Sequence, residues 1–149
     1  MKPSYTIAVF ASGSGTNFAA IERAAASGKL DVNVGLLVCD RPSAPVVGLA
    51  ERAGVPVFAF KPKDYPSREA YEAEIVRKLE QHRVDLIVLA GYMRIVSEQL
   101  LRPYEGRMIN IHPSLLPAFP GMDAIGQALA HGVKVTGVTV HFVDGGLDS

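Results

Sequence analysis

Residues 5–17 read YTIAVFASGSGTN, and this stretch decides the fold. Residues 5–11 are an apolar run, which is typical of a buried strand. The turn Ser12-Gly13-Ser14-Gly15 ends that run, and residues 16–27 then carry helix formers that stop at Gly28. The stretch therefore predicts a strand, a glycine-rich turn and a helix, which together make the first unit of a parallel sheet.

The same alternation of strand and helix signals continues along the chain. Further strands are predicted over residues 32–38, 55–60, 86–90, 107–111 and 135–143, and further helices over residues 44–53, 67–82 and 123–131, with a loop at 61–66. Strands without polar alternation fit a sheet that helices cover on both faces. We expect one α/β domain over residues 1–149, with a doubly wound, mainly parallel sheet.

The helix expected over residues 67–82 has the clearest pattern. Ser67 is a good N-cap, and Glu69 falls in the first turn, where a negative charge complements the helix dipole. Tyr71, Ile75 and Leu79 recur every four residues, so they share one face.

Composition limits the range of partners. Fifteen basic and fifteen acidic residues give zero formal net charge, so the chain lacks the basic excess typical of proteins that bind nucleic acid or anionic membranes. The single cysteine, Cys39, has no partner for an internal disulfide, and the apolar stretch at residues 7–11 is shorter than a signal peptide's core. We expect a cytoplasmic protein with small-molecule ligands.

In a doubly wound sheet, ligands bind where the carboxyl ends of the strands meet the following loops. The first loop, residues 12–17, has glycines and leads into a helix N-terminus, which favours a phosphate. A tight turn that needs glycine for its geometry is the plain alternative. A dinucleotide fingerprint fails because Phe18 stands at its third glycine position, although Asp40 stands where a ribose-binding acid would.

Two later loops also follow predicted strands. The second loop, residues 91–96, combines aromatic, thioether and aliphatic groups with Arg94, which suits a flat, partly polar ring or simple core packing. The third loop, residues 141–148, places Asp144 and Asp148 around a Gly-Gly turn. No metal is expected, because His112, His141 and the aspartates lack the spacing of a usual metal-binding motif.

The pair Asn110 and His112 comes at the end of the strand predicted over residues 107–111. Residues i and i+2 of a strand project to the same side, so the amide and the imidazole can converge on one reacting atom. Pro113 has no N–H to donate, which should end the strand at His112. A strand exit with an incidental histidine is the alternative.

Four ordered motifs together resemble the glycinamide ribonucleotide transformylase family, also called phosphoribosylglycinamide formyltransferases. They are ASGSGTN at 11–17, AGYMRI at 90–95, NIHPSLLP at 110–117 with FPG at 119–121, and VTVHFV at 138–143 followed by LD at 147–148. The resemblance implies a Rossmann-like formyltransferase fold and transfer of formyl from 10-formyltetrahydrofolate to the glycine amine of phosphoribosylglycinamide, in de novo purine biosynthesis. The family continues with further strand and helix, so we expect a domain that lacks its C-terminal elements.

The resemblance also implies a set of site residues. The catalytic residues would be Asn110, His112 and Asp148. The substrate phosphate would bind at Gly15, Thr16 and Asn17. The folate would contact Arg68, Met93, Arg94, Ile95, Val96, Asn110, Asp144, Gly145, Gly146 and Leu147.

Both the chemistry and the remaining alternatives follow from these residues. An amine that attacks a formyl carbon gives a tetrahedral intermediate with a negative oxygen, which the Asn110 amide and a protonated His112 can stabilise. A nearby carboxylate, Asp148 by resemblance, favours the charged imidazole. We expect no metal and either a monomer or a homodimer. The alternatives are another folate-dependent formyltransferase, a formyltetrahydrofolate hydrolase, or a non-catalytic module that binds a phosphorylated metabolite.

Overall fold

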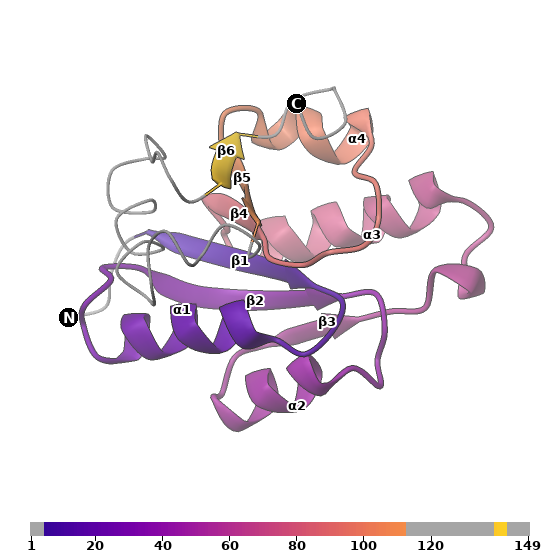
Figure 1. Cartoon of the computed structure of the whole chain (residues 1–149). Helices are drawn as coiled ribbons and strands as arrows, with labels where there is room; N and C mark the ends of the chain where they lie inside the picture. The colour runs from indigo at the N-terminus through magenta and orange to yellow at the C-terminus, as the bar shows by residue number, and fades with distance from the viewer. Residues whose placement is uncertain (1–4, 113–138, 143–149) are drawn as a thin grey trace.

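A computed structural model of the chain describes residues 5–112 and 139–142. Its six strands form one sheet in the order β3-β2-β1-β4-β5-β6 (Figure 1). The strands are β1 (Thr6–Ala11), β2 (Asn33–Cys39), β3 (Val57–Ala59), β4 (Leu86–Leu89), β5 (Met108–His112) and β6 (Thr139–Phe142). The first five run parallel, and β6 pairs antiparallel with β5. The expected doubly wound, mainly parallel sheet is confirmed.

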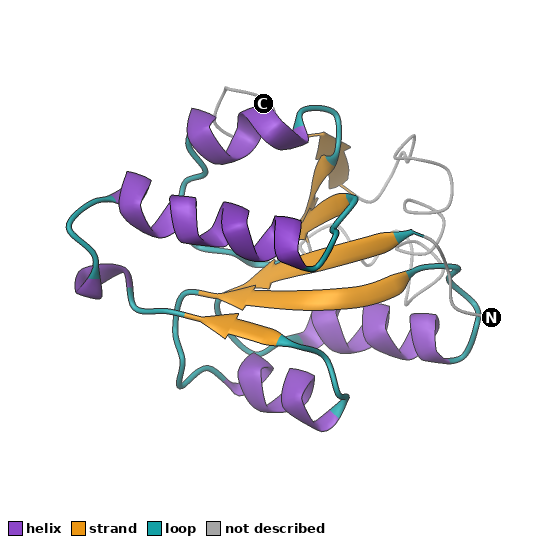
Figure 2. Cartoon of the chain, turned by 180° about the vertical axis from the view of Figure 1, so that it is seen from behind, coloured by secondary structure: helices purple, strands orange, loops and turns teal. Residues whose placement is uncertain are grey.

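Helices cover the sheet on both faces. One face carries α1 (Thr16–Ala26) and α2 (Pro45–Arg52), and the other carries α3 (Arg68–Gln81) and α4 (Glu98–Leu101). The same two layers are seen from behind in Figure 2. Two short 3-10 turns, η1 (Pro62–Asp64) and η2 (Arg102–Tyr104), complete the described helical segments.

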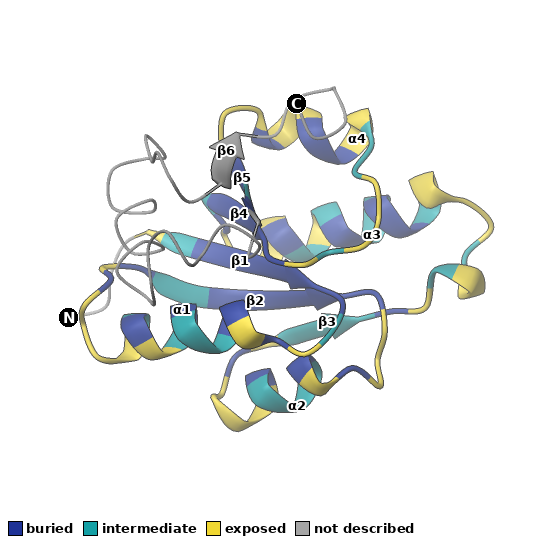
Figure 3. Ribbon diagram, in the orientation of Figure 1, coloured by how far each residue is buried: buried dark blue, intermediate teal, exposed yellow. Residues whose placement is uncertain are grey.

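Successive side chains of the central strands point alternately into two hydrophobic cores, one on each face of the sheet. In β1, Ile7 and Val9 pack toward α1 and α2, while Ala8 and Phe10 pack toward α3 and α4. All four are fully buried, as the dark central strands of Figure 3 show. This double burial explains why the strand sequences are apolar without alternation.

The strand order changes direction at β1, which lies between β2 and β4. Ala11 pairs with Cys39 of β2, and Phe10 pairs with Leu89 of β4. The carboxyl ends of three strands therefore lie side by side, and the loops that follow them start from one edge of the sheet. This is the crevice where doubly wound proteins bind ligands.

Most element boundaries agree with the expectations from sequence, and the differences have local causes. The strand expected over residues 55–60 is only three residues long, because β3 has a single pairing partner at the edge of the sheet. The helix α4 was not expected, because four residues are too few to show helical periodicity. Predictions over residues 123–131 and most of 135–143 lie outside the described residues.

None of the helices in the described part of the chain has the length and apolar character that a membrane crossing requires.

The predicted helix cap is confirmed, and it can be tested. The Ser67 hydroxyl accepts a hydrogen bond from the Ala70 N–H at 3.1 Å. Ser67→Ala should lower the free energy of unfolding by about 1 kcal/mol, because it leaves that N–H without its side-chain acceptor. Urea unfolding measures the change. Ser67→Asp retains an acceptor and should keep most of the stability; an equal loss in both variants would show that the cap does not matter.

Candidate active site

The first loop turns directly into α1. Gly15 is the N-cap residue, with φ of +83°, a conformation that favours glycine. A Cβ at this position would lie 2.6 Å from Cγ2 of Val46 in α2. Gly15 is therefore required by backbone conformation and helix packing, which is the plain alternative raised by the sequence. At Gly13 a Cβ would meet nothing within 4 Å, so this glycine faces open space.

The start of α1 offers free N–H groups. No side chain of the described residues caps the helix, because its N-cap residue is glycine. Thr16 is exposed, and its hydroxyl lies 3.2 Å from that of Ser14. Asn17 is 9% exposed. Uncapped N–H groups at a helix N-terminus favour an anion, so the first loop has the chemistry that a phosphate needs.

A buried carboxylate joins the first loop to the second. Asp40 follows β2 directly and is 3% exposed. It accepts hydrogen bonds from the Ser12 hydroxyl at 2.5 Å and from Nε of Arg94 at 2.9 Å. The Ser12 Oγ in turn accepts from the Met93 N–H at 2.9 Å. Asp40 therefore supports both loops, and its two oxygens are already engaged.

This network gives Asp40 and Arg94 roles that the sequence did not indicate. Asp40 stands after β2, as a ribose-binding acid would, but it is bonded to protein groups instead. The hydrogen bond to Asp40 raises the pKa of Arg94 above its ordinary value. Asp40 is separated from Ser12 by 28 positions and from Arg94 by 54. A local sequence pattern cannot predict contacts between residues so far apart in the chain.

The segment after the second loop is anchored by another buried carboxylate. Glu72 of α3 is 1% exposed, and it accepts hydrogen bonds from the N–H of Ser97 at 3.0 Å and from the Ser97 hydroxyl. Ser97 is the N-cap of α4. This pair was not predicted from the sequence. Its signal was a glutamate on the apolar face of α3, one position after Tyr71.

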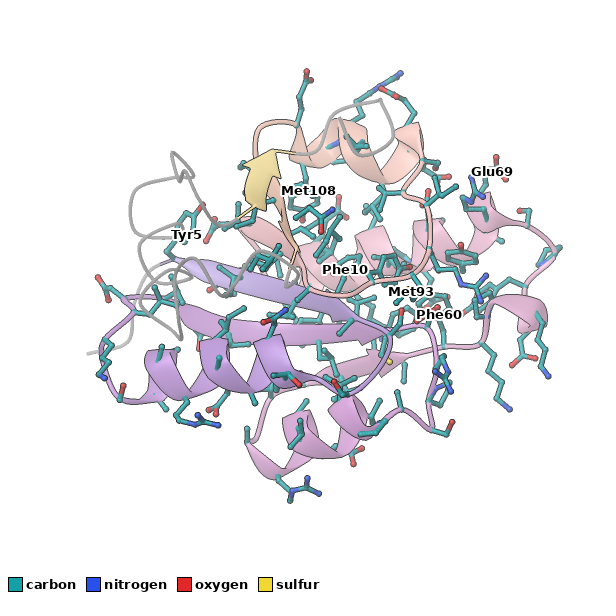
Figure 4. All side chains as sticks on the ribbon, in the orientation of Figure 1. Tyr5, Phe10, Phe60, Glu69, Met93 and Met108 are labelled. Atoms are coloured by element: carbon teal, nitrogen blue, oxygen red, sulfur yellow. The ribbon has the colours of Figure 1, made fainter. Side chains whose placement is uncertain are left out.

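The second loop presents apolar groups between these two anchors. Met93 is 79% exposed and Ile95 is 49% exposed, so two large apolar side chains of this loop lie at the surface. Figure 4 shows Met93 near the end of the central strands. Tyr92 of the same loop is half-buried and packs edge-to-face on Phe10, with ring centroids 5.2 Å apart. Burial raises the pKa of the Tyr92 phenol, which stays protonated at neutral pH.

The remaining predicted residues are only partly within the described structure. Asn110 is half-buried near the end of β5, and its backbone pairs with His141 of β6. β5 reaches His112, and Pro113, which is predicted to end it, lies outside the described residues. Arg68 is exposed at the first position of α3, and Val96 is half-buried. The side chain of His112 and five residues of the third loop lie outside the described residues; the five are Asp144, Gly145, Gly146, Leu147 and Asp148.

The structure thus brings together two of the predicted groups of residues. The backbones of the first and second loops meet where the Ser12 N–H donates to the Gly91 carbonyl at 3.2 Å. β5, with Asn110, is the neighbour of β4 in the sheet. Within residues 5–112 and 139–142, no group of three or more His, Cys, Asp or Glu side chains is arranged to hold a metal ion.

Comparison with known proteins identifies a family. A profile described as formyl transferase matches residues 5–149. The phosphoribosylglycinamide formyltransferase of Bacillus subtilis (strain 168) is 54% identical over 142 residues, which are 95% of this chain and 73% of that protein. The trifunctional purine biosynthetic protein adenosine-3 of Drosophila melanogaster is 44% identical over 146 residues, which are 96% of this chain and 11% of that protein.

A solved structure agrees with these matches. The crystal structure of glycinamide ribonucleotide transformylase 1 from Geobacillus kaustophilus aligns with a TM-score of 0.80 and 61% sequence identity. The alignment covers 97% of this chain and 77% of that one. The Rossmann-like fold expected from the motifs is therefore confirmed.

The two glycines of the first loop should respond differently to substitution. Gly15→Ala should lower the free energy of unfolding by about 1 to 3 kcal/mol, because it adds a Cβ against Val46 and strains a positive φ. Gly13→Ala has space and should cost less than about 0.5 kcal/mol. Urea unfolding of both variants measures the difference. Equal losses would contradict the packing role of Gly15.

Proposed function

The chain belongs to the formyl transferase family, and we propose that it transfers the formyl group of 10-formyltetrahydrofolate to the glycine amine of phosphoribosylglycinamide, a step of purine biosynthesis. One geometric observation carries the proposal. A loop suited to a phosphate and a loop suited to a flat ring are hydrogen-bonded to each other at the switch point of the sheet, beside the strand that bears Asn110. Both substrates of such a transfer can therefore bind next to each other.

The first loop is the proposed phosphate site. Gly15, Thr16 and Asn17 form the start of α1, where the N–H groups and the helix dipole attract an anion. Gly15 contributes indirectly, since it allows the turn that presents these groups. Thr16 can add its exposed hydroxyl, and Asn17 its amide.

The second loop is the proposed folate site. Met93, Ile95 and Val96 offer apolar contact for the pterin ring system, and the exposure of Met93 and Ile95 leaves them accessible. Arg94 bonds Asp40 through Nε, and its side chain remains 46% exposed. Its outer nitrogens can therefore meet a carboxylate of the folate tail, as can Arg68. The third-loop residues Asp144 to Leu147 would complete this site.

The proposed chemistry is nucleophilic acyl transfer. The amine nitrogen bonds to the formyl carbon, and the carbonyl oxygen gains the negative charge. The Asn110 amide and a protonated His112 donate hydrogen bonds to this oxygen and stabilise it more than the neutral formyl group. Asp148 accepts the proton that the amine loses, directly or through water. Collapse of the intermediate re-forms the carbonyl and breaks the bond between the formyl carbon and N10 of the folate. N10 takes up the proton that Asp148 received from the amine, directly or through water, and tetrahydrofolate leaves.

We also propose the setting of the reaction. The formyl-folate acts as a co-substrate, and no metal takes part. The protein binds these small molecules and neither nucleic acid nor a membrane. It is a cytoplasmic protein that acts as a monomer or a homodimer. The zero net charge of the chain supports the absence of a nucleic-acid partner.

An assay with three acceptors tests the proposal. The protein is mixed with 10-formyltetrahydrofolate under three conditions: with phosphoribosylglycinamide, with no acceptor other than water, and with initiator methionyl-tRNA. The release of tetrahydrofolate is compared among the three. We expect release that depends on phosphoribosylglycinamide. Release without an acceptor would instead identify a hydrolase, and release that requires the tRNA would identify a different formyltransferase. Binding without release would favour the non-catalytic module.

Substitution of the proposed oxyanion donors should reduce turnover. Asn110→Ala or His112→Ala should each cost about 2.7 to 4 kcal/mol of transition-state stabilisation, because each removes a donor to the developing charge. Nucleotide binding should change less. The controls are Asn33→Ala, at the start of β2, and His82→Ala, at the end of α3, which lie away from the two loops. Unchanged turnover in both site variants would exclude them from the mechanism.

The two loops should contribute to different ligands. Asn17→Ala should weaken binding of the nucleotide, because it removes a polar group beside the phosphate site. Met93→Ala should weaken binding of the folate, because it removes an exposed apolar contact. Calorimetry with each ligand separately measures both effects. The opposite pattern, with folate lost in Asn17→Ala and nucleotide lost in Met93→Ala, would reverse the assignment.

A further inference from the structure

We propose that Asp40 is a positioning residue for the transfer reaction, which holds the first and second loops in one fixed arrangement so that the two bound substrates meet. This inference rests on the proposed function, because it concerns the two substrates of that reaction. Asp40 follows β2, Ser12 follows β1 and Met93 lies in the loop after β4. One carboxylate thus links the ends of three adjacent strands.

The link is a closed ring of hydrogen bonds. One oxygen of Asp40 accepts from the Ser12 hydroxyl, and Ser12 Oγ accepts from the Met93 N–H. Arg94 follows Met93 in the chain and donates from Nε to the other oxygen of Asp40. Neither loop can shift relative to the other without breaking at least one of these bonds.

A role in packing alone does not account for this charge. Burying a carboxylate costs free energy that one ion pair does not reliably repay, and an apolar side chain often stabilises such a site equally well. Asp40 is 3% exposed, while its partner Arg94 is 46% exposed in its side chain. What the charge provides is geometry, since Oδ1 and Oδ2 fix two different loops at once.

That geometry matters for a reaction between two bound molecules. The nucleotide is held by the first loop and the folate by the second, so the distance from amine to formyl carbon depends on how the loops are placed. A displacement of about 1 Å can cost roughly a hundredfold in rate. Both carboxylate oxygens of Asp40 are occupied by protein groups, so it acts through the loops rather than on a ligand.

Glu72 provides a matched control. It is also a buried carboxylate, 1% exposed, and it also receives two hydrogen bonds, both from Ser97 just after the second loop. None of its described hydrogen bonds reaches the first loop. Loss of either carboxylate removes a buried polar anchor, but only loss of Asp40 removes hydrogen bonds to both loops. The Ser12–Met93 and Ser12–Gly91 bonds remain, without the carboxylate that fixes their geometry.

The test compares Asp40→Asn, Ser12→Ala and Glu72→Gln in the full chain. We expect Asp40→Asn to lower kcat by about a hundredfold, with each KM changed by less than about tenfold, because each ligand keeps its own loop. Ser12→Ala opens the same ring and should show the same split. Glu72→Gln should lower kcat by less than about tenfold. Urea unfolding gives the stability of each variant, so a kcat loss that follows stability across all three would overturn the proposal.

Nuclear magnetic resonance supplies a readout that does not need turnover. In Asp40→Asn, the amide signals of Gly13 and Gly15 and the methyl signal of Met93 should all shift, whereas Glu72→Gln should leave the glycine signals in place. If the parent protein transfers formyl and Asp40→Asn matches Glu72→Gln in kcat, the positioning role is wrong and the function stands. If the parent transfers no formyl, the proposed function is wrong, and the glycine signals decide whether Asp40 links the loops. If Asp40→Asn does not fold, Ser12→Ala takes its place in both the kinetic and the nuclear magnetic resonance comparison with Glu72→Gln.

Discussion

The pairing of β1 with a parallel strand on each edge is the constraint on which the rest of the structure depends. β1 pairs in parallel with β2 and β4, with one register shift against β2 between Ile7 and Ala8, and residues 7–11 are almost completely buried. This strand therefore fixes the carboxyl ends of its neighbours beside its own. The loops after these strands have no other place to start, so the polar groups they carry are gathered at one edge of the sheet.

Two buried carboxylates then hold the loops at this edge with hydrogen bonds. Asp40 connects the second loop to the first, and Glu72 holds Ser97 just beyond the second loop. Between them, Met93 and Ile95 remain exposed although they are large and apolar. A loop anchored at both ends can present apolar groups to a ligand without collapsing onto the core. Anchoring the first and second loops in this way lowers the entropic cost of binding a ligand to them.

Much of the fold could be predicted because it depends on local patterns. The cap at Ser67 is confirmed, and the face that Tyr71, Ile75 and Leu79 share in α3 is buried. Such features involve residues within one or two helical turns of each other. For the site, only the positions of the loops could be predicted, because they follow from the ends of the strands and from the family motifs. The roles of Asn110, His112 and Asp148 remain predictions.

The sequence alone determined the order of the described strands and of α1, α2 and α3, the doubly wound sheet and the loops that bear polar groups. These features depend on hydrophobic periodicity and turn residues at positions close together in the chain. Only the tertiary structure decided which loops touch and what holds them. Gly15 owes its identity partly to Val46 of another helix, and Asp40 finds its partners 28 and 54 positions away. These contacts follow from strand order, and strand order results from packing the whole chain rather than from any one segment.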